Sequence, residues 1–396
     1  MPPHEPRSRL PRTVVVLGAV SFLMDTSSEM VHAVLPVFLV AVVGATPLVI
    51  GVIEGLAESL ALMVKVLSGY WSDRSYRRKP LIMAGYGLAA LSKPLFALAP
   101  GVGLVLGARL LDRTGKGLRG APRDALIADV TPVGRRGAAF GLRQSMDTAG
   151  AVAGPLLAML LLWLSSEDFR FVFWIAALPA AACVVLLWLG VRESRRDSID
   201  QARLAGSLSG LGGMFWLVVL VGFVFQLARF SEAFLLLRAE QLGWTWVAVP
   251  LVLVVVNIAY ALTAYPAGAL SDRFGRKRLL LPAIVLLVLA DLAFAKWNSP
   301  LGLLVGAALW GAHMGLSAGV LAAFVTDSAP ALRRGLAFGV FNFVSGVALF
   351  AASVVAGALW QLYSAAIPFY AGAIMAVLAG LLVLLLPAHG TRRVAG

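Results

Sequence analysis

The feature that most restricts the fold is a series of twelve long apolar runs that follow one another along nearly the whole chain, separated by short turns. A helix needs about 20 mainly apolar residues to cross the hydrocarbon core of a membrane, and a β-strand needs about half as many. Of the 396 residues, 60% are hydrophobic and only 13% are charged, whereas about a quarter are charged in soluble domains. The sequence therefore predicts an all-α integral membrane protein with twelve transmembrane helices. We expect these helices at 13–42, 47–70, 80–99, 101–127, 137–164, 170–191, 213–237, 245–270, 279–297, 300–326, 335–361 and 364–388.

The basic residues outside these runs fall mainly on one side of the predicted topology. They lie in the terminal segments and in every second loop, whereas the opposite side holds only Arg170, Arg238 and Lys296. Because cytoplasmic loops are rich in Lys and Arg, both termini are predicted to be cytoplasmic, in a cell membrane (inner or plasma). This bias also explains the net charge of +13 without nucleic acid as a partner. The first run is too long for a signal peptide and carries Asp25 and Glu29, so we expect it in the mature protein.

Two sequence patterns occur twice, about half the chain length apart. "GYWSDRSYRRK" (69–79) corresponds to "GALSDRFGRKR" (268–278), at an offset of 199. "DVTPVGRRGAAFG" (129–141) corresponds to "DSAPALRRGLAFG" (327–339), at an offset of 198. Two matches at nearly the same offset indicate an internal repeat of two six-helix halves. The predicted units are an N-terminal bundle at 1–191, a cytoplasmic linker at 192–212 and a C-terminal bundle at 213–396.

The first of these patterns, G-x-x-x-D-R-x-G-R-K-R, resembles the loop motif of the major facilitator superfamily of transporters. The copy at 268–278 matches the motif in full, and the copy at 69–79 has Tyr76 where the family usually has Gly. The resemblance covers the whole chain. It implies the major facilitator fold, with two pseudo-symmetric six-helix bundles, in a functional monomer.

In this family the motif latches the two bundles together on the cytoplasmic side. The resemblance therefore implies that Asp73 lies near the start of the eleventh span and Arg77 near Asp129. The alternative is that these arginine clusters serve only as topology determinants. The implied gating residues are Gly69, Asp73, Arg74, Arg77, Asp129, Gly268, Asp272 and Arg273.

The fourth span carries a stripe of charge. Its members include Arg109, Asp112, Arg113 and Lys116, which share one helix face at i, i+3, i+4 and i+7. The corresponding stretch of the second half, "ALWGAHMGLSAGVLAA", is fully apolar, so we expect the fourth span to be a membrane helix too. A charge that faces lipid at the midplane costs about 2.5 to 3.5 kcal/mol. The stripe is therefore predicted to face protein or a water-filled cavity between the bundles.

Other intramembrane charges also gather in the first half, which holds six acids and six bases within its spans when Arg119, Arg123 and Asp124 at the cytoplasmic end of the fourth span are left out. Because the numbers balance, many of these groups are candidates for structural ion pairs as well as for substrate contacts, and both roles stay open. The second half is poorer in charge and offers a more apolar wall. The candidate substrate-binding residues are His32, Arg109, Asp112, Arg113, Lys116, Arg143, Arg229, Glu232, Asn257, Tyr260, Trp310, Phe341 and Asn342.

The fifth span reads "GLRQSMDTAGAVAGPLLA" and resembles the antiporter signature of proton-coupled exporters in the same superfamily. It departs from that signature at Ala158 and Met159, where the signature has a pair of glycines. The alternative is ordinary close packing through small residues. Proton coupling needs a group that changes protonation as its surroundings change, and burial favours the neutral form of a carboxyl group. The candidate proton-coupling residues are Asp25, Glu29, Glu58 and Asp147.

We expect neither a metal site nor enzyme activity. Asp25, Glu29 and His32 share a helix face, but Arg109 and Arg113 would compete for the same carboxylates. The chain contains no nucleotide-binding loop, metal-binding signature or nucleophile elbow, so no catalytic residue and no cofactor is predicted. The expected partners are a small-molecule solute, protons and the lipid bilayer.

These observations favour a secondary active transporter that exports a small organic solute, amphipathic or anionic, by proton-coupled alternating access. An importer of an organic anion or phosphorylated metabolite is the alternative, with Arg109, Arg113 and Arg143 as the anion clamp. A sensor or a lipid flippase on the same scaffold is the third hypothesis. The sensor is disfavoured because the longest segment outside the membrane has only about twenty residues.

Overall fold

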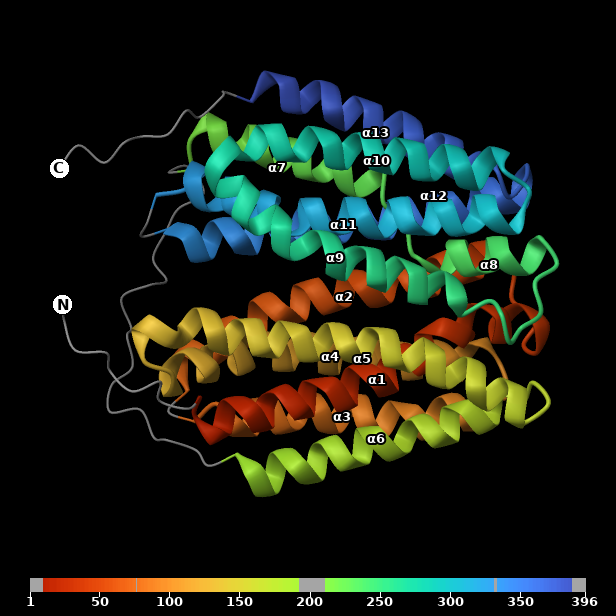
Figure 1. Cartoon of the computed structure of the whole chain (residues 1–396), viewed down its shortest axis with the longest axis horizontal. Coiled ribbons are helices and arrows are strands. Elements are labelled where there is room, and N and C mark those ends of the chain that lie inside the picture. Colours follow the sequence, from red (N-terminus) through yellow and green to blue (C-terminus); the bar gives the residue numbers. More distant parts are fainter. Residues whose placement is uncertain (1–9, 76, 192–210, 331–332, 387–396) are drawn as a thin grey trace.

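The computed structural model describes residues 10–75, 77–191, 211–330 and 333–386, which form two helical bundles (Figure 1). Among these residues there is no β-strand, as predicted. The first bundle comprises α1 (Arg12–Ala41), α2 (Pro47–Arg74), α3 (Lys79–Leu98), α4 (Val102–Val130), η1 (Val133–Arg135), α5 (Arg136–Leu164) and α6 (Phe169–Gly190). The second comprises α7 (Gly213–Leu227), α8 (Ala233–Gln241), α9 (Leu251–Phe274), α10 (Arg276–Lys296), α11 (Pro300–Ser328), α12 (Arg334–Leu362) and α13 (Ile367–Leu385). The predicted boundary at 192–212 falls largely outside the described residues and stays a prediction.

Within the described part of the chain, nine helices are long and apolar enough to cross a membrane. Helix α4 is also long enough, with 29 residues, but its charges exclude it from such a count. Several helices begin at residues typical of helix starts. Thr46 accepts a hydrogen bond from the Val49 N–H before Pro47, and Ser299 accepts one from the Gly302 N–H before Pro300.

The seventh span differs from the prediction. It was expected as one helix over 213–237, but it is broken into α7 and α8 by residues 228–232. At the break, the Ser231 N–H donates to the Ser353 hydroxyl of α12, and the Ser231 hydroxyl accepts from the Ala233 N–H. Side chains thus replace part of the helical hydrogen bonding. Because the break contains neither Gly nor Pro, hydropathy and helix-breaker patterns could not have indicated it.

Helices α1 and α5 pack with their backbones in contact. A Cβ atom added at Gly150 would lie 2.7 Å from the Phe22 carbonyl oxygen, and one at Gly154 would lie 2.7 Å from the Thr26 carbonyl oxygen. Real side chains do not approach so closely, so both positions require glycine in this arrangement. The small residues of the signature-like segment therefore bring α5 against the part of α1 that carries the candidate acids.

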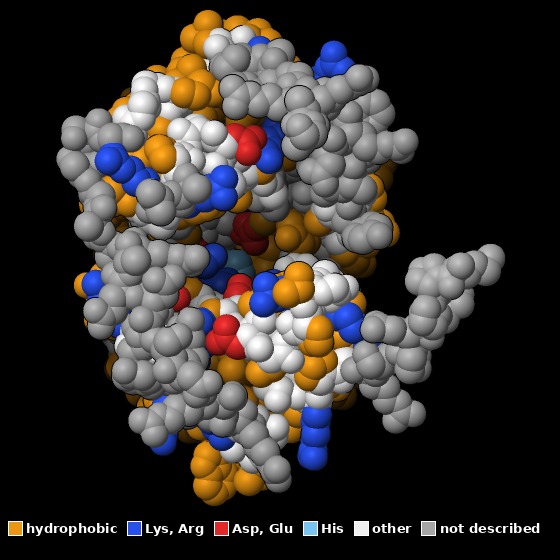
Figure 2. All heavy atoms as spheres, turned by 90° about the vertical axis from the view of Figure 1, so that its left-hand side faces the viewer, with side chains coloured by type: hydrophobic (Ala, Val, Ile, Leu, Met, Phe, Trp, Pro, Cys, Tyr) orange, Lys and Arg blue, Asp and Glu red, His pale blue; other side chains and the backbone are white. Residues whose placement is uncertain are grey.

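The two bundles meet on the side away from the start of α1 and the end of α13 (Figure 1). There, Gly51 and Gly55 of α2 lie against the α12 backbone at Ser353 and Phe350, and α8 packs against α1. Figure 2 shows the opposite face, where a hollow lined with charged side chains separates the bundles. The structure is therefore closed on one side and open on the side where α1 begins and α13 ends.

Candidate functional site

The charged stripe of α4 points into the protein, as predicted, and most of it is held in buried ion pairs. The Arg109 guanidinium lies 2.6 Å from the Glu54 carboxylate of α2, with both side chains only 1% exposed. The Lys93 ammonium of α3 lies 2.6 Å from the Asp112 carboxylate, with exposures of 0% and 3%. These pairs join α4 to α2 and α3. Arg109 and Asp112 therefore act as structural partners between helices in this conformation.

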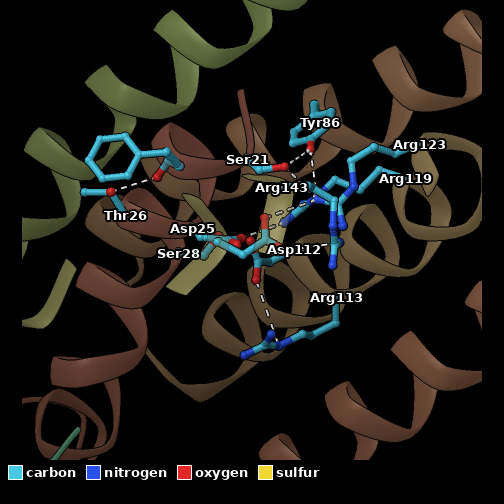
Figure 3. Close-up of polar contacts among 12 residues, drawn as sticks. Ser21, Asp25, Thr26, Ser28, Tyr86, Asp112, Arg113, Arg119, Arg123 and Arg143 are labelled. Atoms are coloured by element: carbon cyan, nitrogen blue, oxygen red, sulfur yellow. Dashed lines mark hydrogen bonds and ion pairs between the residues drawn. The ribbon is translucent and has the colours of Figure 1, made fainter. Parts of the chain in front are cut away.

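Closer to the open side, the stripe has partners on α1 and α5. Figure 3 shows these side chains converging. Arg119 lies 3.5 Å from the Asp25 carboxylate of α1, and Arg143 lies 3.1 Å from Asp147, one helical turn along α5. Arg123 donates a 2.8 Å hydrogen bond to the Ser21 hydroxyl. The network thus joins α1, α4 and α5 near the mouth of the hollow.

All four candidate proton-coupling residues remain partly accessible while they are paired, and the side chain of Asp147 is 17% exposed in its pair with Arg143. Asp25 has 24% of its side chain exposed, and Glu29, 3.3 Å from the His32 ring nitrogen, has 19%. Glu58 has 30% exposed and lies 3.0 Å from Arg113, which is itself 3% exposed. When a carboxylate that is paired with a base takes up a proton from water, it becomes neutral and its attraction to that base is lost.

One cation of the stripe differs from the others. Lys116 is exposed and, among the described residues, belongs to no ion pair. It lies close enough to Asp25, Glu29 and Glu58 for its charge to act on all three carboxylates. Because each of these acids is paired with another base, Lys116 carries a positive charge that no single carboxylate compensates.

The candidate substrate-binding residues of the second half do not form one cluster. Arg229 and Glu232 lie in the break between α7 and α8, and both are half-buried. The Asn257 amide of α9 donates a 2.8 Å hydrogen bond to the Ala151 carbonyl of α5, so it joins the two bundles. Phe341, Tyr260 and Asn342 are also half-buried. Trp310, by contrast, is 1% exposed inside the second bundle, so it does not line the hollow in this conformation.

The predicted gating motif forms an ion pair one residue away from the expected position. Asp129 lies 3.0 Å from Arg78, where Arg77 had been expected. In the second half, Arg276 pairs with Asp327. Both residues of this second pair are 198 positions beyond those of the first, whereas the sequence comparison had aligned 276 with 77 at an offset of 199. The first loop therefore contains one extra residue, and the second turns at Gly275, which has φ +85°.

The lysine after each of these arginines has a shared structural role. The Lys79 ammonium donates hydrogen bonds to the Trp188 and Val191 carbonyls at the end of α6, at 2.9 and 2.7 Å. The Lys277 ammonium donates in the same way to two carbonyls at the end of α13, at 2.7 and 2.8 Å. A lysine at a helix C-terminus satisfies carbonyls that have no helical partner. These caps were not foreseen from the sequence.

The remaining gating candidates have few contacts. Asp73 is exposed and has no ion pair within the described part of the chain. Arg74 is also exposed, and its guanidinium lies 3.6 Å above the Tyr70 ring. Gly69 faces Ala121 of α4. The expected contact of Asp73 with the start of α12 stays a prediction for a conformation closed on this side. Gly268, Asp272 and Arg273 belong to α9, and the surroundings of their side-chain positions lie outside what the structure describes.

Comparison with known proteins agrees with this architecture. The model of the Major Facilitator Superfamily matches residues 17–258 and 214–396. An uncharacterized MFS-type transporter of Methanocaldococcus jannaschii is 34% identical over 388 residues, which cover 96% of each chain. The class E tetracycline resistance protein of Escherichia coli is 28% identical over 298 residues, 71% of this chain and 70% of that protein. The crystal structure of a D-xylose-proton symporter has the same fold, with a TM-score of 0.75 at 19% identity, and the match covers 95% of this chain and 97% of that one.

The sequence match extends over both bundles and includes both copies of the loop motif. The apolar helices make the protein a multi-pass membrane protein, and members of this family are transporters of small solutes. Proteins with this architecture are generally not enzymes. The chain belongs to the major facilitator superfamily.

Proposed function

We propose that this protein exports a small organic solute that carries a negative charge or is amphipathic, in exchange for protons. The charged hollow between the bundles is the solute path, and the two bundles rock about their interface to open it to either side. The similarity to a tetracycline resistance protein supports export of an organic compound. The packing of Gly150 and Gly154 against α1 brings α5 close to the part of α1 that carries the candidate proton-coupling acids.

The observation that carries the substrate assignment is the charge on Lys116. The neighbouring carboxylates are all paired, so an anionic group of the solute would meet Lys116 without first displacing an internal partner. Arg113 and Arg143 are engaged with Glu58 and Asp147, so they would contact solute only after those pairs open. A charge-assisted contact with one lysine suits a solute that has a single acidic group and an apolar body.

The proton step is assigned to Asp25 and Glu29. Protonation of Asp25 removes its attraction to Arg119 at 3.5 Å, and protonation of Glu29 weakens its contact with His32. Both acids lie where α1 meets α5, because a Cβ at Gly150 would lie 3.1 Å from the Asp25 Cβ atom. Neutralising them therefore loosens the ionic contacts of α1 with α4 and within α1 itself. This couples the protonation state to the way in which α1 moves against the rest of its bundle.

The test uses purified protein in liposomes with an imposed pH gradient and a panel of organic anions and amphipathic compounds. We expect gradient-driven solute flux that falls when Asp25→Asn and Glu29→Gln are combined. Asp168→Asn is the matched control, because Asp168 is a carboxylate at the start of α6 and asparagine also caps helices. Flux unaffected by the double change would refute the proton assignment. Solute movement in the same direction as the protons would favour the alternative, an importer.

A further inference from the structure

The second bundle contains an acid that none of the ion pairs accounts for. Asp291 of α10 is 0% exposed, and neither of its carboxylate oxygens has a hydrogen-bond partner among the described residues. The ion pairs of the described chain do not include it either. An ionised carboxylate is very unfavourable in such a place, because burial removes water and nothing replaces it. The neutral acid, by contrast, has a proton to donate.

A candidate acceptor for that proton borders the same space as the carboxyl group. A Cβ atom added at Gly372 of α13 would lie 2.8 Å from the Asp291 Oδ2 atom and 3.3 Å from the Ala228 carbonyl oxygen. Both oxygens therefore border the same small space, which exists because residue 372 is glycine. Ala228 is the first residue of the break between α7 and α8, and no N–H among the described backbone hydrogen bonds donates to its carbonyl. A protonated carboxyl group fits a free carbonyl, whereas an ionised one would repel it.

The surroundings of this space are aromatic. The Phe230 ring of the break lies 5.4 Å from the Phe369 ring, which stacks on Phe294 at 5.2 Å, centroid to centroid. Helix α10 packs against α9, α11 and α13, and it lies near the break. The titratable side chains that these elements carry toward the interior are Tyr260, His313, Tyr370, Arg229 and Glu232. None of them forms an ion pair with Asp291 in the described structure.

His313 and Trp310 extend the unpaired set. The Trp310 indole N–H is buried without a partner among the described residues, and the buried His313 ring, whose hydrogen-bond contact is with the Trp310 backbone, has at most one of its two nitrogens paired there. The two rings lie 5.3 Å apart, and Trp310 lies 5.7 Å from Phe230. Unpaired buried polar groups are rare in folded proteins and often mark functional positions. The interior of the second bundle therefore holds a polar cluster that is separate from the charge network of the first.

The break connects these two regions. On one side of it, the Ala228 carbonyl and the Phe230 ring lie against the space beside Asp291. On the other side, the Ser231 hydroxyl lies 3.4 Å from the Glu54 carboxylate, which holds Arg109. Helix α8, which follows the break, packs against α1 on the closed side of the molecule. A change at Asp291 would therefore act on a segment that helps to close the transport path.

We propose that Asp291 is a proton-binding site of the second bundle, protonated when the break has the shape seen here, and that loss of its proton opens the contact between α8 and α1. The bound ligand is a proton, because a carboxylate and one carbonyl are too few oxygens to enclose a metal cation. This site stands independently of the exchange of protons at Asp25 and Glu29.

Infrared spectroscopy of the purified full-length protein in H2O and D2O tests the protonation directly. A protonated carboxyl group gives a carbonyl stretching band that is separate from the carboxylate bands. We expect such a band at neutral pH in the unmodified protein, lost in Asp291→Asn and retained in Asp25→Asn. Gly372→Ala should shift the band without removing it, because its methyl group would contact Oδ2. A band unchanged by Asp291→Asn would overturn the assignment. A band that appears only when sodium is removed would also overturn it, because sodium and not a proton would then occupy the site.

The coupling to the gate is tested with spin labels on cysteines at Val42 and Gln241, which are exposed at the ends of α1 and α8. The background is Cys183→Ser, which removes the only native cysteine. We expect the distance between the labels to increase as the pH is raised in this background, and to stay fixed in Asp291→Asn. The same pH response in Asp291→Asn would refute the coupling. Loss of the response in Asp25→Asn, with Asp291 intact, would assign it to the first bundle and refute the coupling as well.

Discussion

The buried pair of Arg109 and Glu54 offers the sharpest test of how this membrane domain is held together. Both side chains are 1% exposed and their charged atoms are 2.6 Å apart. Removing one partner of such a pair leaves an uncompensated buried charge and costs about 3 to 5 kcal/mol. At about 2 to 4 °C per kcal/mol for a unit of this size, either single change should lower the midpoint of thermal unfolding by about 6 to 20 °C.

The two single changes should respond to pH differently. Glu54→Gln leaves a guanidinium that cannot lose its proton, so its destabilisation should be constant with pH. Arg109→Met leaves a carboxylate that can take up a proton and become neutral. Its destabilisation should therefore shrink as the pH is lowered and grow as the pH is raised. The double variant Glu54→Leu with Arg109→Met removes both charges and should recover most of the lost stability.

The assay is thermal unfolding of the protein in one detergent, followed by intrinsic fluorescence from pH 5 to pH 9. Asp124→Asn is the control, because Asp124 is 40% exposed in its contacts with Arg123 and Arg143, and it should cost at most about 1 kcal/mol. The reasoning is refuted if the double variant loses as much as both single variants added together. It is also refuted if Arg109→Met shows no pH dependence.

Three further outcomes follow from the geometry. Lys116→Gln should raise the half-saturating concentration of an anionic solute about tenfold or more, measured in liposome flux assays, with little change for an uncharged solute. Gly154→Ala should destabilise the protein by about 1 to 3 kcal/mol, because its methyl group meets the Thr26 carbonyl. Gly141→Ala is the control, because its methyl group meets no atom within 4 Å. In the same unfolding assay it should be neutral or stabilising by up to about 1 kcal/mol. Arg78→Ala should lower the free energy of unfolding by about 1 kcal/mol, because its partner Asp129 is 38% exposed. A variant as stable as the unmodified protein in thermal unfolding would contradict a structural role for this pair.

The positions of most helices could be predicted because the membrane restricts them strongly. A spanning helix must be long and apolar, and because the sequence repeats, each helix predicted in one half could be checked against its counterpart in the other. The same constraint showed that the stripe with Arg109 faces inward, since lipid would not accept it. The break at 228–232 could not be predicted, because its hydrogen bonds come from Ser231 and from Ser353, which is 122 positions away.

The individual pairings in the site were beyond the sequence for a similar reason. Equal numbers of acids and bases indicated ion pairs, but which base meets which acid depends on how five helices are rotated and shifted against one another. Within the part of the chain that the structure describes, Lys116 has no ion pair and Arg113 has one, although both lie on the same face one turn apart. Arg78 rather than Arg77 meets Asp129 because one inserted residue changes the register of the loop. Asp291 is a single acid in an apolar span, and the sequence does not show that it has no partner, because that depends on which residues pack around it.

The two capping lysines have a consequence for how the molecule moves. Lys79 fastens the third helix of its bundle to the end of the sixth, and Lys277 repeats this fastening in the other bundle. Both ties lie on the side of the molecule where the mouth of the hollow is, at helix ends that would otherwise be free to separate. Widening or narrowing of that mouth must then come from the tilting of two stiff bodies, with the strain carried by the contacts between them.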